Sequence, residues 1–315
     1  MKIAVVDLGT NTFNLLIVEV VENRKFKKIY SDRIAVKLGE DTINKGIISP
    51  KPFQRGITAL HNFKDKINEH NVGMVKAYAT SAIRTAINGN DFIAAAWNEV
   101  AIKVEIIDGN REAELIFSGV SMGVDLPDKP VLIMDIGGGS TEFIISRNKK
   151  IVWKKSYTLG VARIANQFNP EDPIHIKTIE AINNFLHEEL KDLIEIVKQE
   201  KPALLIGSSG AFDSFVDMIA AEKGTIGITE NIHKYPVELN EFRKMYEKTV
   251  PSTTSQRLQM KGLLPMRVDM IVISFLLTKF ILHSCSIQNF LCSIYSLKEG
   301  VIAEMMEELN NTNRI

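Results

Sequence analysis

Two stretches of this 315-residue sequence decide its fold: IAVVDLGTNTFNLLIV at residues 3–18 and VLIMDIGGGSTEFII at residues 131–145. They align at one offset of 128 residues, which places Asp7 on Asp135. Each copy has an apolar strand that ends in Asp, a turn of small and polar residues, and a second apolar strand, so each is predicted to be a β-hairpin. The repeat indicates a duplicated fold with one hairpin in each half of the chain.

The turns of both hairpins have the composition of an anion-binding site. Glycines and small hydroxyl residues let successive backbone N–H groups converge, and an Asp at the end of a strand can hold a hydrated cation. For one copy, a plain hairpin whose Asp caps its turn is the competing interpretation. Two copies in one register favour phosphate and Mg²⁺ binding in a cleft between two related α/β domains.

The overall composition excludes several classes of protein. Lys plus Arg and Asp plus Glu both number 38, so the net charge is zero and no global field attracts nucleic acid or an anionic membrane. Cys285 and Cys292 are the only cysteines, which excludes a disulfide framework and a Cys-rich zinc site. The longest apolar stretch, residues 270–282, is shorter than the roughly 20 residues of a membrane helix. We expect a cytoplasmic protein without a nucleic-acid or membrane partner.

Common motifs for nucleotide binding and hydrolysis are missing. The sequence has no Walker A loop and no HExxH pattern. P-loop nucleotide sites and zincin metal sites are therefore excluded.

A strand followed by small hydroxyl residues and a helix recurs after each hairpin. Residues 74–79 and 203–206 are the predicted strands. Hydroxyls such as Ser208 and Ser209 at a helix N-terminus suit an anion, although ordinary N-capping is the alternative. Arg84 lies one turn into the first of these helices among apolar neighbours, so it needs a partner anion, either a phosphate or a structural carboxylate.

A further helix is predicted over residues 109–123, with Asn110 as its N-cap. Helical periodicity places Glu112 on an apolar face and Glu114 on a polar face. A carboxylate on an apolar face has a raised pKa and suits a general base. An acid that only interacts with the dipole of the first helical turn is the alternative.

Seven segments in order resemble the exopolyphosphatase and guanosine pentaphosphate phosphohydrolase family, within the actin-like, sugar-kinase and chaperone ATPase superfamily. The segments are DLGTNTFNLLI (7–17), ATSAIRTAIN (79–88), GNREAELIFSGV (109–120), DIGGGSTEF (135–143), LGVARI (159–164), PMRVDMI (265–271) and SIYSLKEGVIAE (293–304).

The resemblance implies an α/β fold of two actin-like (ribonuclease H-like) domains with an interdomain cleft. The first domain is expected to comprise residues 1–124 and 298–315, and the second residues 125–297. The implied reaction removes the terminal phosphate of inorganic polyphosphate or guanosine pentaphosphate by in-line attack of water, assisted by Mg²⁺ or another divalent cation.

The resemblance also implies roles for individual residues. Glu112 is the expected catalytic base, and Asp135 and Glu142 are the expected metal-associated carboxylates. The expected phosphate-binding residues are Gly9, Thr10, Asn11, Thr12, Arg84, Gly137, Gly138, Gly139, Ser140 and Thr141. The arguments from the residues themselves add Asp7 to the metal candidates, and Ser208 and Ser209 to the phosphate-binding candidates.

Three basic residues are additional candidates. Arg267 lies in the PMRVDMI segment, where a salt bridge to Asp269 or to a neighbouring element is the alternative to substrate binding. Arg33 and Lys37 are candidates for the rim of the cleft, with a solvated strand face as the alternative.

Two other functions stay open at this stage, because a fold alone does not fix an activity. One is an ATP-dependent small-molecule kinase of the same superfamily, and the other is a noncatalytic sensor of polyphosphate or an alarmone. Phosphate transfer from ATP to a hydroxyl would identify the kinase, and tight binding without turnover would identify the sensor. The sequence does not fix the oligomeric state, and a homodimer is one candidate assembly.

Overall fold

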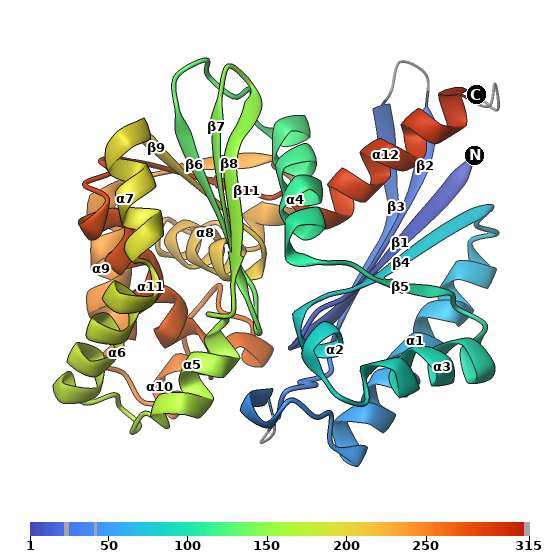
Figure 1. The fold of residues 1–315 in the computed structure, drawn as a ribbon, viewed down its shortest axis with the longest axis horizontal. Coiled ribbons are helices and arrows are strands. Elements are labelled where there is room, and N and C mark those ends of the chain that lie inside the picture. The colour runs from blue at the N-terminus through green and yellow to red at the C-terminus, as the bar shows by residue number, and fades with distance from the viewer. Residues whose placement is uncertain (22–24, 41–42, 312–315) are drawn as a thin grey trace.

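The computed structural model describes residues 1–21, 25–40 and 43–311, which form two mixed β-sheets with helices on their faces (Figure 1). The first sheet has the strand order β3-β2-β1-β4-β5, and its strands are β1 (Lys2–Leu8), β2 (Thr12–Val21), β3 (Lys25–Ala35), β4 (Met74–Ala79) and β5 (Val104–Ile106). The second has the order β10-β11-β9-β6-β7-β8, and its strands are β6 (Val131–Ile136), β7 (Thr141–Arg147), β8 (Lys150–Tyr157), β9 (Leu204–Ser208), β10 (Lys234–Val237) and β11 (Asn289–Ser293).

Helices connect the strands and cover the sheets. They are α1 (Pro50–Glu69), α2 (Ser81–Thr85), α3 (Gly89–Val100), α4 (Gly109–Gly123), α5 (Val161–Phe168), α6 (Ile176–Glu189), α7 (Lys191–Glu200), α8 (Gly210–Glu222), α9 (Leu239–Thr249), α10 (Thr254–Arg257), α11 (Ile271–Ser284) and α12 (Leu297–Asn311). Within the described part of the chain, no helix has both the length and the apolar character that a bilayer span requires.

Both predicted hairpins are present and have the same register. β1 pairs antiparallel with β2 so that Asp7 faces Asn14, and β6 pairs antiparallel with β7 so that Asp135 faces Glu142. Each hairpin then receives a parallel strand beside its first strand, β4 next to β1 and β9 next to β6. The internal repeat is therefore confirmed as a repeat of sheet topology.

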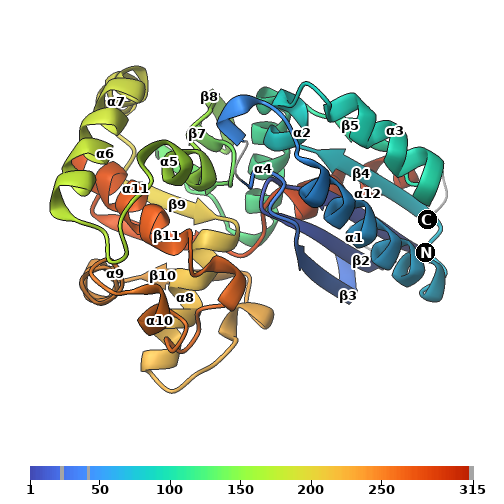
Figure 2. The same ribbon diagram turned by 90° about the horizontal axis from the view of Figure 1, so that it is seen from below.

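Alternating side chains bury both faces of each sheet. Ala4 and Val6 of β1 point into a core beneath α1 and α3, whereas Ile3 and Val5 point into a central core with α4 and α12. Alternate residues of β6 likewise enter the central core or a third core beneath helices of the second half. Figures 1 and 2 show α4 between the two sheets, which therefore share the central core.

The predicted α/β fold class with two actin-like halves is confirmed by this duplicated topology and by the solved structures compared below. Helix α12 returns to the first sheet and packs against β1 and α4, as expected for the last helix. The boundaries proposed for the two domains stay a prediction. Residues 22–24, 41–42 and 312–315 of the predicted first domain lie outside the described residues.

The predicted N-cap of α4 is wrong by two residues. The cap is Asp108, whose extended backbone precedes the helix and whose Oδ1 accepts a hydrogen bond of 2.8 Å from the Arg111 amide. Asn110 instead lies within the first turn. Asp108 and Asn110, the two outer residues of the DGN sequence, both have side chains that can cap a helix, and Asp108 is the one placed to reach the third amide of the helix.

Helices α4 and α12 approach each other closely at two glycines. A Cβ atom on Gly300 would overlap the carbonyl oxygen of Leu115, and one on Gly119 would overlap the carbonyl oxygen of Ser296. In both cases the obstructing atom belongs to the backbone and cannot rotate away. The close crossing of these helices therefore depends on residues without side chains.

We predict that Gly300→Ala lowers the free energy of unfolding by about 1 to 3 kcal/mol, because overpacking outweighs the helix propensity gained with Ala. Urea denaturation measures this change. Glu307→Ala is the matched control, because Glu307 is exposed on the same helix and its loss should change stability by less than about 0.5 kcal/mol. A Gly300→Ala protein as stable as the parent would contradict the close crossing.

Candidate active site

The two hairpin turns are closed by equivalent hydrogen bonds. The Gly9 amide donates to the Thr12 carbonyl at 3.2 Å, and the Gly137 amide donates to the Ser140 carbonyl at 2.9 Å. The sequence repeat therefore extends to the detailed geometry of the turns.

The turns lie in direct contact with each other. A Cβ atom on Gly138 would lie 2.8 Å from Cγ of Asn11, and one on Gly139 would lie 2.6 Å from the hydroxyl oxygens of Thr10 and Ser81. Real Cβ atoms do not approach other atoms so closely. The prediction that the duplicated turns face each other is confirmed, and two residues without side chains make the approach possible.

A cleft of about 960 Å³ runs between the two halves of the molecule beside these turns. Most of the predicted site residues line it: Asp7, Gly9, Thr10, Asn11, Thr12, Arg33, Glu112, Asp135, Gly137, Gly138, Gly139, Ser140, Ser209 and Arg267. Five do not: Lys37, Arg84, Thr141, Glu142 and Ser208. The cleft thus brings together residues from both hairpins and from α4.

Glu112 is the acid of α4 that reaches the cleft. Glu112 is only 7% exposed to solvent, in agreement with its predicted place on an apolar helix face. Its Oε2 accepts a hydrogen bond of 2.8 Å from Nη1 of Arg84. Burial raises the pKa of Glu112 well above its usual value, and the charge of Glu142 adds to this effect while Arg84 opposes it. A carboxyl group in this environment is suited to accept a proton from water.

Arg84 pairs with a carboxylate of the protein, that of Glu112. Besides Glu112, its Nη1 donates to the carbonyl oxygen of Ile107 at 2.9 Å. This is the alternative that the sequence left open, and it makes Arg84 a residue that orients Glu112. The direct contact with phosphate that was expected of Arg84 stays a prediction.

The second hairpin contains two facing acids. Ser156 donates to Glu142 at 2.6 Å, and Ser208 and Ser296 donate to Oδ2 of Asp135 at 2.7 and 2.5 Å. Burial raises the pKa of Glu142 to about 7 and also raises the pKa of Asp135, and the Asp135 charge adds to the shift at Glu142. The second hairpin therefore holds two buried acids, of which Asp135 lines the cleft.

The first hairpin has a neutral partner at the equivalent place. Nδ2 of Asn14 donates to Asp7 at 3.0 Å. Loss of hydration in the surrounding protein raises the pKa of Asp7 to about 6, and the charge of Lys298 opposes that shift. The duplicated hairpins therefore differ in charge, with one acid in the first and two in the second.

Three hydroxyls expected to bind phosphate have partners within the protein. Ser208 ends β9 and its hydroxyl donates to Asp135, so its expected position at a helix N-terminus is wrong. Ser209 precedes α8 directly as the N-cap residue, and its hydroxyl donates to the carbonyl of Ile136 at 3.1 Å. The Thr141 hydroxyl donates to the carbonyl of Leu159 at 2.8 Å. These side chains hold the second hairpin in place.

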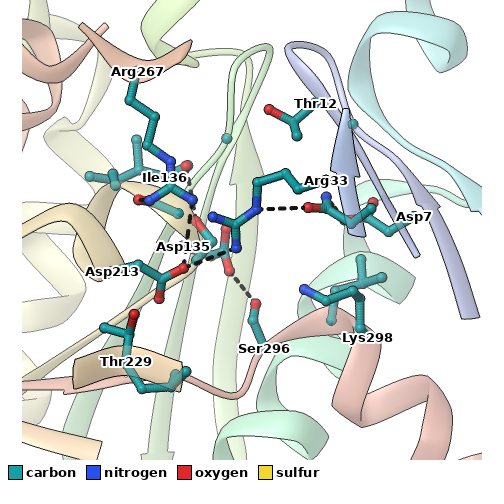
Figure 3. Close-up of a pocket in the computed structure, with 18 of the residues that line it drawn as sticks. Asp7, Thr12, Arg33, Asp135, Ile136, Asp213, Thr229, Arg267, Ser296 and Lys298 are labelled. Atoms are coloured by element: carbon teal, nitrogen blue, oxygen red, sulfur yellow. Dashed lines mark hydrogen bonds and ion pairs between the residues drawn. The ribbon is translucent and has the colours of Figure 1, made fainter. Parts of the chain in front are cut away.

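A group of charges spans the cleft beyond the turns, as Figure 3 shows. Asp213 of α8 accepts from Nη2 of Arg33 at 3.4 Å and lies 3.6 Å from Nη2 of Arg267. Asp269 is therefore not the partner of Arg267, because Asp269 pairs with Lys37 at 2.8 Å. The other alternative given for Arg267, a salt bridge to a neighbouring element, is confirmed by its pairing with Asp213 of α8. Burial lowers the pKa of Arg267 to about 10, which leaves it charged at neutral pH.

Sequence reasoning missed several residues of the cleft. Asp213, Ser296 and Lys298 all line it, and none was a candidate. Ser296 and Lys298 lie at the start of α12, within the SIYSLKEGVIAE segment already noted for its resemblance. That segment was the available signal, although it did not indicate which side chains face the cleft.

The two related α/β halves define an actin-like fold. The facing turns and the buried acids at the cleft between the halves give it the features of a phosphoryl-transfer site. More specifically, the chain belongs to the Ppx/GppA phosphatase family, whose family model matches residues 16–309.

Individual relatives agree with this family membership. The crystal structure of an exopolyphosphatase from Cytophaga hutchinsonii is 37% identical, has a TM-score of 0.94 and covers 98% of both chains. The bifunctional 3-dehydroquinate synthase/phosphatase of Fusobacterium nucleatum is 32% identical over 98% of this chain, which spans only 46% of that relative's length. Exopolyphosphatase 1 of Mycobacterium leprae is 24% identical over 98% of this chain and 90% of the relative.

We predict that Asp213→Asn lowers the free energy of unfolding by about 3 kcal/mol, because the largely buried Arg267 loses its carboxylate partner. Asp269→Asn is the control. It removes the carboxylate partner of Lys37, but both side chains of that pair are more than 40% exposed, so the cost should stay below about 1 kcal/mol. Urea denaturation of both variants tests this; equal losses would contradict the difference in burial.

Proposed function

We propose that this protein hydrolyses the terminal phosphoanhydride bond of inorganic polyphosphate. The observation that carries the proposal is the position of Glu112, a buried carboxyl group with a raised pKa in the cleft where the two glycine-rich turns meet. The relatives named exopolyphosphatase support this substrate. They favour a hydrolase over the kinase and the sensor that the sequence left open.

The chemistry requires an oriented water and stabilisation of charge on phosphate oxygens. The backbone amides and hydroxyls of the two turns are placed to bind the terminal phosphoryl groups. Glu112, oriented by Arg84, accepts a proton from water as the water oxygen bonds to the terminal phosphorus. The bond from that phosphorus to the bridging oxygen breaks, which releases inorganic phosphate and a chain shorter by one unit.

We further propose that the site uses Mg²⁺ or another divalent cation. Among the described residues, no three or more His, Cys, Asp or Glu side chains form a ready metal cluster. Mg²⁺ is commonly held by one or two carboxylates together with substrate phosphates and water, so it does not need such a cluster. Asp7 and Asp135 line the cleft and Glu142 faces Asp135, so these residues would hold it. When bound, such a cation offsets the charge of the phosphate chain.

Several finer points remain predictions. Guanosine pentaphosphate is a second candidate substrate, and it belongs in the same assays as polyphosphate. A cytoplasmic location, the absence of nucleic-acid and membrane partners, and a homodimer are also predictions for this protein.

Glu112→Gln should lower the rate of phosphate release from polyphosphate by about 10² to 10⁴-fold, because the amide cannot accept the proton of water. Binding of polyphosphate, measured by calorimetry, should persist. The matched control is Glu114→Gln on the same helix, whose carboxylate pairs with Lys154 and Arg111 outside the cleft. The control should retain its rate within about twofold.

Unchanged turnover in Glu112→Gln would remove this residue from the mechanism. Transfer of phosphate from ATP to a hydroxyl acceptor would favour the kinase instead. Tight binding of polyphosphate by the parent protein without any turnover would favour the sensor.

Removal of divalent cations should abolish phosphate release, because the phosphate chain would then face uncompensated carboxylates. The measurement is phosphate release with EDTA, followed by addition of Mg²⁺ in excess. Recovery of activity with Mg²⁺ is the expected result, and full activity in EDTA would contradict the role of a cation.

A further inference from the structure

Lys298 is a cation of the cleft that the proposed mechanism does not yet use. It is the second residue of α12 and lines the cleft together with Asp7 and Asp135. Figure 3 shows its side chain pointing into the cleft between Asp7 and Ser296. The return of α12 to the first sheet therefore brings a lysine to the side of the cleft that contains the acids.

The position of Lys298 in its helix does not favour stability. A helix N-terminus carries partial positive charge, so a lysine in the first turn is repelled by the backbone, whereas the adjacent Glu299 is attracted. Glu299 indeed accepts a hydrogen bond of 2.9 Å from the Ser296 amide at this end of the helix. The positive charge of Lys298 therefore lies near a helix N-terminus whose partial positive charge repels it.

The ammonium group also lacks a fixed partner. Across residues 1–21, 25–40 and 43–311, it forms no hydrogen bond or ion pair, although its charge acts on Asp7 and on Asp135. Those carboxylates instead accept hydrogen bonds from Asn14, Ser208 and Ser296. Lys298 is therefore near the acids and still available to another anion.

We propose that Lys298 is a further substrate-binding residue, whose ammonium group donates to phosphoryl oxygens of a bound phosphate chain beside Asp7 and Asp135. A flexible lysine with three donors suits phosphate oxygens, and its charge offsets the repulsion between the chain and the acids of the cleft. This proposal rests on the proposed function for the identity of its ligand, a linear inorganic phosphate chain.

The test measures binding apart from turnover. Tripolyphosphate is titrated by calorimetry, in the presence of Mg²⁺, into Glu112→Gln protein and into the same protein carrying Lys298→Gln or Lys298→Arg. Lys298→Gln should weaken binding by about 10- to 100-fold, as expected for loss of a charged hydrogen bond, and Lys298→Arg should restore most of it. Lys76→Gln is the matched control. Lys76 lies on β4 and pairs at 2.5 Å with Glu308, a residue of α12 like Lys298, but this pair is away from the cleft.

A second measurement covers the case in which Lys298→Gln does not fold. In ¹⁵N-lysine-labelled Glu112→Gln protein, the Nζ resonance that Lys298→Arg removes should shift on saturation with tripolyphosphate. Equal affinities of Lys298→Gln and its parent, or an Nζ resonance that does not move, would overturn the proposal. The two proposals can also fail separately. If tripolyphosphate binding depends on Lys298 but the protein without any substitution does not hydrolyse polyphosphate, the proposed function is refuted and this inference stands.

Discussion

The contact between the two hairpin turns is the constraint on which the site depends. Gly138 and Gly139 lie against Thr10, Asn11 and Ser81 at distances that leave no room for a Cβ atom. The turns belong to different sheets, so this contact fixes how the two halves of the molecule meet at one end of the cleft. Everything else in the cleft is positioned relative to that meeting point.

Negative charge is the second organising feature. Glu112, Asp135 and Glu142 are all nearly inaccessible to water, and burial is the largest cause of the raised pKa of each. The protein stabilises them with hydroxyl donors and with Arg84, and it leaves part of their charge uncompensated. A cleft of this kind favours ligands that bring cations with them, as phosphate chains do.

Local patterns predicted much of the architecture. The hairpins, the strands after them and the inward face of α4 all follow from short-range periodicity, and the structure confirms them. Pairings over long sequence distances did not follow. Arg84 and Glu112 are 28 residues apart, and Ser296 and Asp135 are 161 apart.

Those missed contacts have a common physical cause. Periodicity shows that a side chain faces inward, but only the path of the whole chain determines which element it meets. Asp213 shows the same limit, because an acid in the first turn of α8 looks like ordinary dipole compensation until Arg33 arrives from the other sheet. The capping error at Asn110 has a different origin, since a second suitable capping residue, Asp108, lies only two positions earlier.

The return of α12 to the first sheet has a consequence for biosynthesis. Val301, Ile302 and Met305 fill the central core against Ile3 and Val5, although they are translated almost three hundred residues later. The part of this core that α12 covers therefore stays exposed to water until α12 has been synthesised. Apolar surface that is exposed in this way before folding is complete favours aggregation of the nascent chain.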